Sequence, residues 1–140
     1  MMNRSAAIED LVTRWFAAAS SGDATLVDSA VSGDEGVCLI GSDPDEWFTG
    51  GGPVAEFLRG EVTNAGGRAR FTAQDVVAFE DGGLGWARAK LTITLPDGSH
   101  INPRWTAVFR REEGATWRFV HIHASIGVPN DAAGWIYPEG

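Results

Sequence analysis

Apolar residues in the first part of the chain recur every three to four positions, which is typical of helices with one buried face. A first helix is expected between Ser5, a suitable N-cap, and Gly22, a suitable stop. Its buried stripe is Ile8, Leu11, Val12, Trp15, Phe16 and Ala19. A shorter helix is expected after Asp23, and a third one starts at Pro53. The inward positions of that third helix are Val54, Phe57, Leu58 and Val62.

The helical period disappears after Gly67, and strand-like runs replace it. A short apolar run at 36–41 is also of strand type, and the four later runs span 68–80, 85–95, 101–111 and 116–125. The connections between the later runs are short and turn-like, so these strands are expected to be antiparallel neighbours. The pattern predicts an α+β fold with three N-terminal helices packed on one face of a curved, mainly antiparallel sheet.

A length of 140 residues suits a single domain, expected over 1–140 with a core at about 6–129 and a tail at 130–140. The formal net charge of −8 disfavours nucleic acid and anionic membranes as partners. No stretch reaches the roughly 20 apolar residues of a membrane span, and acidic residues interrupt the N-terminus where a signal peptide would be apolar. Cys38 has no cysteine to pair with, so a cytoplasmic protein is expected.

Three segments carry a family resemblance: the Gly22-Asp23 break, the stretch 39–50 and the stretch 107–125. With the order of elements, they resemble the nuclear transport factor 2-like superfamily, particularly its SnoaL-like branch. The last stretch is also similar to the association domain of calcium/calmodulin-dependent protein kinase. The resemblance implies a cone-shaped, cystatin-like fold with a pocket between the concave sheet face and the helices. It also implies that the protein forms a homodimer through the convex face.

Asp43-Pro44 is the feature most suggestive of catalysis, because ketosteroid isomerase members of the superfamily carry Asp-Pro in this region. The aspartate there moves a proton on carbon, which an apolar pocket favours by raising its pKa. The alternative is that Asp43 is a turn residue. Trp15 stands where those enzymes place a tyrosine, and Thr106 and Ala107 stand where they place a second acid. The isomerase machinery is therefore incomplete.

The other binding candidates come from the resemblance and from the aromatic residues. Similarity to the kinase association domain implies that Arg104 and Thr106 face the pocket, where Arg104 could hold a carboxylate. A solvent-exposed arginine at a strand end is the alternative. Trp15, Trp47 and Phe57 are expected to contact the ligand.

His121 and His123 lie two positions apart on one strand, together with Trp117 and Phe119, so alternation puts all four on one face. A metal site needs a third ligand, and nothing in the sequence supplies it, so no metal is predicted. The resemblance places Ile122 and Ala124 on the pocket side and the histidines on the convex, dimer-forming side. A bulge could instead turn a histidine inward as a general base.

Taken together, these observations predict a protein that binds a small, largely apolar molecule in its cone. If it is an enzyme, it is expected to transfer protons on carbon, as an isomerase, cyclase or dehydratase without a cofactor, with Asp43 as the base. The alternative is a non-catalytic oligomerisation or partner-binding module whose pocket is vestigial.

Overall fold

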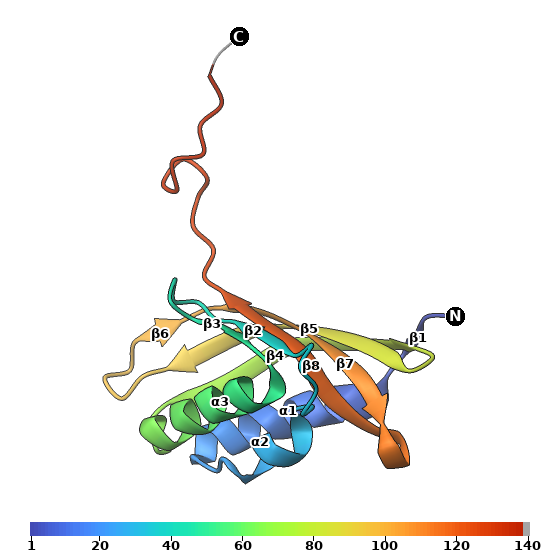
Figure 1. Cartoon of the computed structure of the whole chain (residues 1–140). Coiled ribbons are helices and arrows are strands. Elements are labelled where there is room, and N and C mark those ends of the chain that lie inside the picture. The colour runs from blue at the N-terminus through green and yellow to red at the C-terminus, as the bar shows by residue number, and fades with distance from the viewer. Residues whose placement is uncertain (139–140) are drawn as a thin grey trace.

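In the computed structural model, which describes residues 1–138, the strands form one curved sheet that the three helices cover on one face (Figure 1). The helices are α1 (Ala6–Ser21), α2 (Thr25–Ala30) and α3 (Gly51–Ala65). The strands are β1 (Asn3–Arg4), β2 (Cys38–Ile40), β3 (Trp47–Thr49), β4 (Arg70–Asp81), β5 (Leu84–Thr94), β6 (His100–Ile101), β7 (Arg104–Glu112) and β8 (Thr116–Ser125). A 3-10 turn (Glu113–Ala115) joins β7 to β8. The predicted α+β class, with helices on a curved and mainly antiparallel sheet, is confirmed.

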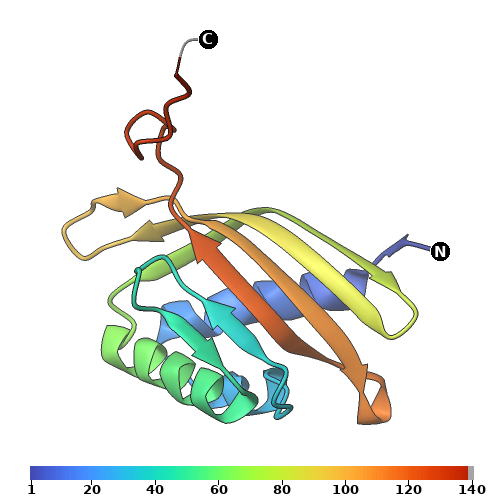
Figure 2. The ribbon, with the colours of Figure 1, turned by 45° about the horizontal axis from the view of Figure 1, so that its top comes forward.

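The strand order is β1-β4-β5-β7-β8-β2-β3, and β6 pairs with β5 (Figure 2). The four long strands β4, β5, β7 and β8 are antiparallel neighbours, as their short connections predict. Only the pairing of β2 with β8 is parallel among the described strands. The sequence pattern did not indicate β1, β3 or β6 as separate strands. Of these, β3 matters most for the site, because the turn at 41–46 that leads into it borders the cavity described below.

Both ends of α1 follow the sequence signals. The Ser5 hydroxyl accepts a hydrogen bond from the Ile8 N–H at 3.2 Å, and Ser5 itself is buried. Gly22 ends the helix with a φ of 75°, a left-handed conformation that glycine adopts without strain. At the start of the next helix, the Asp23 carboxylate accepts hydrogen bonds from the N–H and the hydroxyl of Thr25. The Gly22 cap sets where α1 stops, and the Asp23–Thr25 hydrogen bonds hold the turn that leads into α2.

Small residues on the inner sheet face let the N-terminal half of α1 pack closely against it. Ala78, Ala87 and Ala107 are almost fully buried there. At Gly85, an added Cβ would lie only 2.3 Å from the Cδ1 atom of Ile8, so no larger residue fits without movement. The dry core therefore fills this end of the fold, and the space between helices and sheet opens at the other end.

A β-bulge in β8 changes which side chains face inward. Val108 of β7 pairs with His121, but the next residue, Phe109, pairs with Phe119, so Val120 is an extra residue. Phe119 before the bulge and Ile122 after it are both buried. The expectation that Trp117 and Phe119 share a face with the histidines is therefore wrong, because the extra residue shifts the alternation. Trp117 and Phe119 face the core.

Residues 126–138 leave the end of β8 and run away from the rest of the domain (Figures 1 and 2). Trp135, Ile136 and Tyr137 are 61%, 71% and 74% exposed, so these large side chains do not dock on their own domain. No helix within residues 1–138 is both long enough and apolar enough to span a membrane.

Candidate functional site

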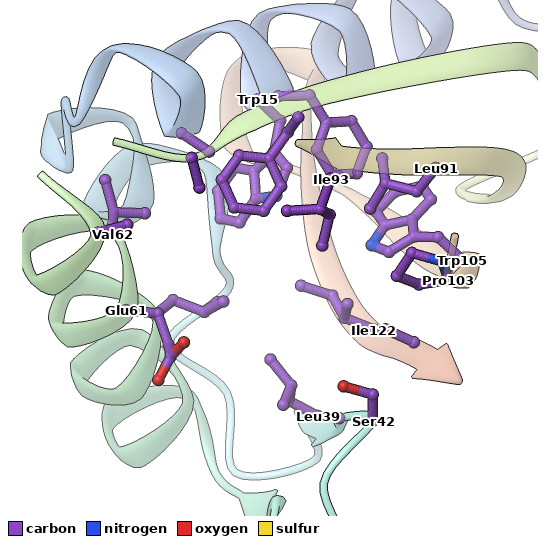
Figure 3. Close-up of a pocket in the computed structure, with 18 of the residues that line it drawn as sticks. Trp15, Leu39, Ser42, Glu61, Val62, Leu91, Ile93, Pro103, Trp105 and Ile122 are labelled. Carbon is purple, nitrogen blue, oxygen red and sulfur yellow. The ribbon is translucent and has the colours of Figure 1, made fainter. Parts of the chain in front are cut away.

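A cavity of about 370 Å³ lies between the three helices and the inner face of the sheet (Figure 3). This size is within the range of small-molecule sites. Its lining is mostly apolar and comes from all three helices, from the strand ends of the sheet and from the turn at 41–46. The sheet contributes Leu39, Phe71, Leu91, Ile93, Trp105, Ile122 and Ala124, and the helices contribute Trp15, Phe16, Ala19, Leu26, Val27, Phe57, Leu58, Val62 and Ala65. An apolar molecule that enters would lose water on most of its surface.

Aromatic contacts hold one wall of this cavity in place. The Phe16 and Trp105 rings meet edge to face, with centroids 5.0 Å apart. The Trp15 ring lies 4.6 Å from that of Phe119, which belongs to the core. Trp15 and Trp105 are 8% and 4% exposed, although both line the cavity. Because the core fixes these rings, the wall is formed before any ligand binds.

The polar groups of the lining come from α3, from the turn at 41–46 and from residue 23. Glu61 of α3 stands across the open space from Ile122 and Ser42 (Figure 3). Glu46, in the turn before β3, also lines the cavity, and one of its carboxylate oxygens accepts a hydrogen bond from the Asp43 N–H at 3.0 Å. Asp23 is the third acidic residue of the lining, but its carboxylate already accepts a hydrogen bond from the Thr25 N–H. No lysine, arginine or histidine among residues 1–138 lines the cavity.

The environment of Glu61 opposes its ionisation. Burial against the lining raises the pKa of the Glu61 carboxyl, and the negative charge of Glu46 raises it further. Glu61 is nevertheless a solvent-exposed residue, so it can exchange protons with water. A carboxyl group with a raised pKa that lines an apolar cavity can act as a proton donor or acceptor, or can bind a positively charged group.

Comparison with known families identifies the chain. The family of SnoaL-like domains matches residues 8–129. The chain belongs to this family. Its fold is the cystatin-like fold of the nuclear transport factor 2-like superfamily, as the sequence resemblance predicted. No match was found among the curated proteins.

Solved structures resemble this SnoaL-like domain over most of its length. A nuclear transport factor 2-like protein of unknown function from Pseudomonas putida is 19% identical, covers 93% of this chain and 94% of its own, and has a TM-score of 0.78. An uncharacterised cystatin-like protein from Caulobacter vibrioides is 18% identical, with coverages of 91% and 92% and a TM-score of 0.73. A suspected ketosteroid isomerase from Shewanella frigidimarina is 13% identical, with coverages of 86% and 96% and a TM-score of 0.71. At these identities the likeness shows the fold alone.

Asp43 does not line the cavity of this SnoaL-like domain. It is exposed, and its carboxylate accepts a hydrogen bond from the Asp45 N–H at 2.9 Å while its carbonyl accepts one from the Glu46 N–H. This geometry is that of a turn residue, the alternative reading of the sequence. The expectation of a base at Asp43 inside the cone does not fit its position.

Arg104 and Thr106 lie on the outer face of the sheet, contrary to the expectation from the kinase association domain. They pair with Lys90 and Arg88 of β5, and all four side chains are exposed. Trp105, Ala107 and Phe109 face inward instead, and Trp105 lines the cavity. Trp47, which is 66% exposed, also lies outside the cavity lining. The alignment implied by the resemblance was one residue out of register in β7. A shift of one residue exchanges the two faces of a strand.

Trp15 and Phe57 are the two predicted contact residues that line the cavity. Sequence reasoning missed Glu61 and Trp105. Glu61 lies four positions after Phe57, one helical turn along the inward stripe, so the helical period does indicate its direction. Trp105 was placed on the opposite face by the same register error that affected Arg104.

The two histidines lie on the outer face after the bulge. His121 pairs with Val108 and Cys38, and His123 pairs with Thr106 and Ile40. Ile122 and Ala124 line the cavity, as the resemblance predicted. Within residues 1–138, no three His, Cys, Asp or Glu side chains gather in a way that could hold a metal ion.

Proposed function

We propose that this protein binds a small, largely apolar molecule in the cavity between its helices and its sheet. The observation that carries the proposal is the lining: aromatic and aliphatic side chains surround about 370 Å³ of space that the protein's own residues leave open. An empty apolar space of this size inside a small domain loses packing energy unless a ligand fills it. The rigid wall formed by Trp15 and Trp105 supports binding without a large rearrangement.

The test is a titration with N-phenyl-1-naphthylamine, a neutral probe whose fluorescence rises in apolar surroundings. Saturable binding is expected for the wild type. Ala65→Phe would place a ring in the cavity and should weaken binding at least about tenfold. Thr63→Phe adds the same ring at an exposed position of α3 outside the lining, and should leave binding unchanged. Equal effects of the two variants would contradict the proposal.

Proton transfer on carbon is a second candidate function, and Glu61 is the residue that supports it. Its carboxyl has a raised pKa and faces an apolar cavity, which are the properties a carbon base needs. The indole N–H groups of Trp15 and Trp105 donate to no other described residue, so either can bond an oxygen of the ligand. The isomerase name of one structural neighbour suggests the same reaction class.

This chemistry is tested by solvent exchange. Cyclic ketones that bind the cavity are incubated in deuterium oxide, and deuterium incorporation at the carbon next to the carbonyl is followed by NMR. Glu61→Gln should reduce the rate to the uncatalysed level, whereas Asp43→Asn should leave it unchanged. A rate that Glu61→Gln does not alter would contradict proton transfer by Glu61, while ligand binding would still stand.

The outer sheet face supports association into a homodimer. Strand register aligns Phe79, Trp86, Val108, His121 and Cys38 in one row across β4, β5, β7, β8 and β2, and we name this set the outer row. Val108 at its centre is 36% exposed, and Phe79 stacks on Trp86 with ring centroids 6.2 Å apart. A continuous row in which most side chains are apolar favours contact with a second copy. If the cavity binds nothing, such association would be the protein's function, as in the alternative drawn from the sequence.

A further inference from the structure

The polar side chains of the cavity are all acidic or neutral. Glu46 and Glu61 line it together with Asp23 and Ser42, and the rest of the lining is apolar or glycine. Since no lysine, arginine or histidine from residues 1–138 belongs to the lining, no positive charge there can hold an anion. Every charged side chain of the lining is therefore negative. This property bears on which ligands the cavity can bind.

Glu61 has no counter-ion within residues 1–138. Its carboxylate makes no ion pair with any residue between 1 and 138, although other carboxylates of the domain are paired: Arg59 of the same helix pairs with Asp28. Glu46 accepts one hydrogen bond from the backbone of Asp43 and likewise has no cationic partner among the described residues. Burial is the main cause that raises the pKa of the Glu61 carboxyl, and the negative charge of Glu46, which lines the same cavity, raises it further.

We infer that the cavity selects ligands with an apolar body and a basic amine, which Glu61 and Glu46 bind at the mouth. The inference rests on the proposed binding function but not on proton transfer. An ammonium group would sit between the two carboxylates and end their repulsion, while the apolar body would lie against Trp15 and Trp105. A ligand carboxylate would meet two like charges and no cation, and the protein's net charge of −8 adds to its exclusion.

The experiment uses three ligands with the same apolar body: 2-naphthylmethylamine, 2-naphthalenemethanol and 2-naphthoate. Their affinities are measured by isothermal titration calorimetry at pH 7. The amine should bind at least about tenfold more tightly than the alcohol, and the carboxylate more weakly than the alcohol. If the alcohol binds but the amine and the carboxylate bind equally well, the proposed preference for amines is wrong, and the proposal that the cavity binds apolar molecules stands. If none of the three binds, both proposals are wrong.

Variants identify the groups responsible. Glu61→Gln, alone and with Glu46→Gln, should bring the amine's affinity to that of the alcohol while leaving the alcohol's affinity within about twofold. Glu56→Gln is the matched control, because it removes one negative charge from the same helix at an exposed position outside the cavity lining. This control variant should still bind the amine more tightly than the alcohol, by the same factor as the wild type. A loss of preference in Glu56→Gln as large as in Glu61→Gln would mean that the net charge of the protein, and not the cavity, attracts the amine.

Discussion

The indole ring of Trp15 on α1 lies against the phenyl ring of Phe119 on β8, with centroids 4.6 Å apart and an interplanar angle of 47°. Phe119 is fully buried and also contacts Phe109, with the two ring centroids 4.5 Å apart. Trp15 in turn lines the cavity. This pair joins the dry core to the cavity wall, so the position of the wall depends on the packing of the core.

Replacing Phe119 with alanine should therefore destabilise the whole domain. The change leaves a hole beside Trp15 and Phe109, and we expect a loss of about 3–5 kcal/mol in the free energy of unfolding. Urea titration followed by far-UV circular dichroism measures it. Phe48→Ala is the control, because Phe48 is only half-buried and stacks on Phe57 at the edge of the core, whereas Phe119 lies at its centre. Similar losses in the two variants would show that Phe119 has no special place in the core.

Acid should weaken a second contact, the one that joins β7 to the chain after α2. Glu112 accepts a hydrogen bond from Ser32 at 2.7 Å and pairs with Arg110, and these contacts lower the pKa of its carboxyl, Arg110 having the larger effect. A lowered pKa means that the ionised form stabilises the fold. The stabilisation is present at neutral pH and is lost as the pH falls below the ordinary glutamate value of 4.5.

Glu112→Gln tests this dependence. At pH 7 the variant should lose about 1–2 kcal/mol of unfolding free energy, and its difference from the wild type should shrink as the pH falls from 5 towards 3. Urea titrations at several pH values measure the difference. Glu113→Gln, at the exposed neighbouring position, should show almost no difference at any pH. A Glu112→Gln deficit that stays constant down to pH 3 would contradict the role of the charge.

Much of the fold could be predicted because local chemistry determines it. The period of α1, its Ser5 and Gly22 caps and the short turns between the long strands all depend on neighbours in sequence. Which face of a strand points towards the core does not depend on neighbours in sequence alone. The alternation in β7 defines two faces but does not say which one meets the helices, and the bulge at Val120 arises from pairing with β7.

The site was harder to predict for the same reason. Asp43 attracted attention because of its family motif, but its own neighbourhood of turn-forming residues was the better guide. Glu61 was overlooked because a charged residue in an amphipathic helix usually marks the solvent side. Its direction follows from the stripe of α3, but its chemical importance follows only from the cavity and from Glu46, which lies in a distant part of the chain.

Association through the outer row is tested at its centre. Val108→Lys places a positive charge where two copies would bring their apolar rows together, so it should turn a dimer into a monomer. Size-exclusion chromatography with light scattering measures the mass, which we expect to fall by half. Val128→Lys makes the same change in the exposed tail and should leave the mass unaltered. A wild type that is already monomeric, or a variant that stays dimeric, would contradict the proposal.

Asp43 and Glu61 give opposite predictions for ligand binding, although both are acidic. Asp43→Asn keeps the oxygen that accepts the Asp45 N–H, so we expect unchanged stability and affinity for 2-naphthylmethylamine within about twofold of the wild type. Asp43→Ala loses that hydrogen bond and should cost about 1 kcal/mol of stability, again without weakening the binding. Calorimetric titration and urea unfolding measure both quantities. If Asp43→Asn weakened amine binding as much as Glu61→Gln does, the turn at 41–46 would have to bring the Asp43 carboxylate into the site.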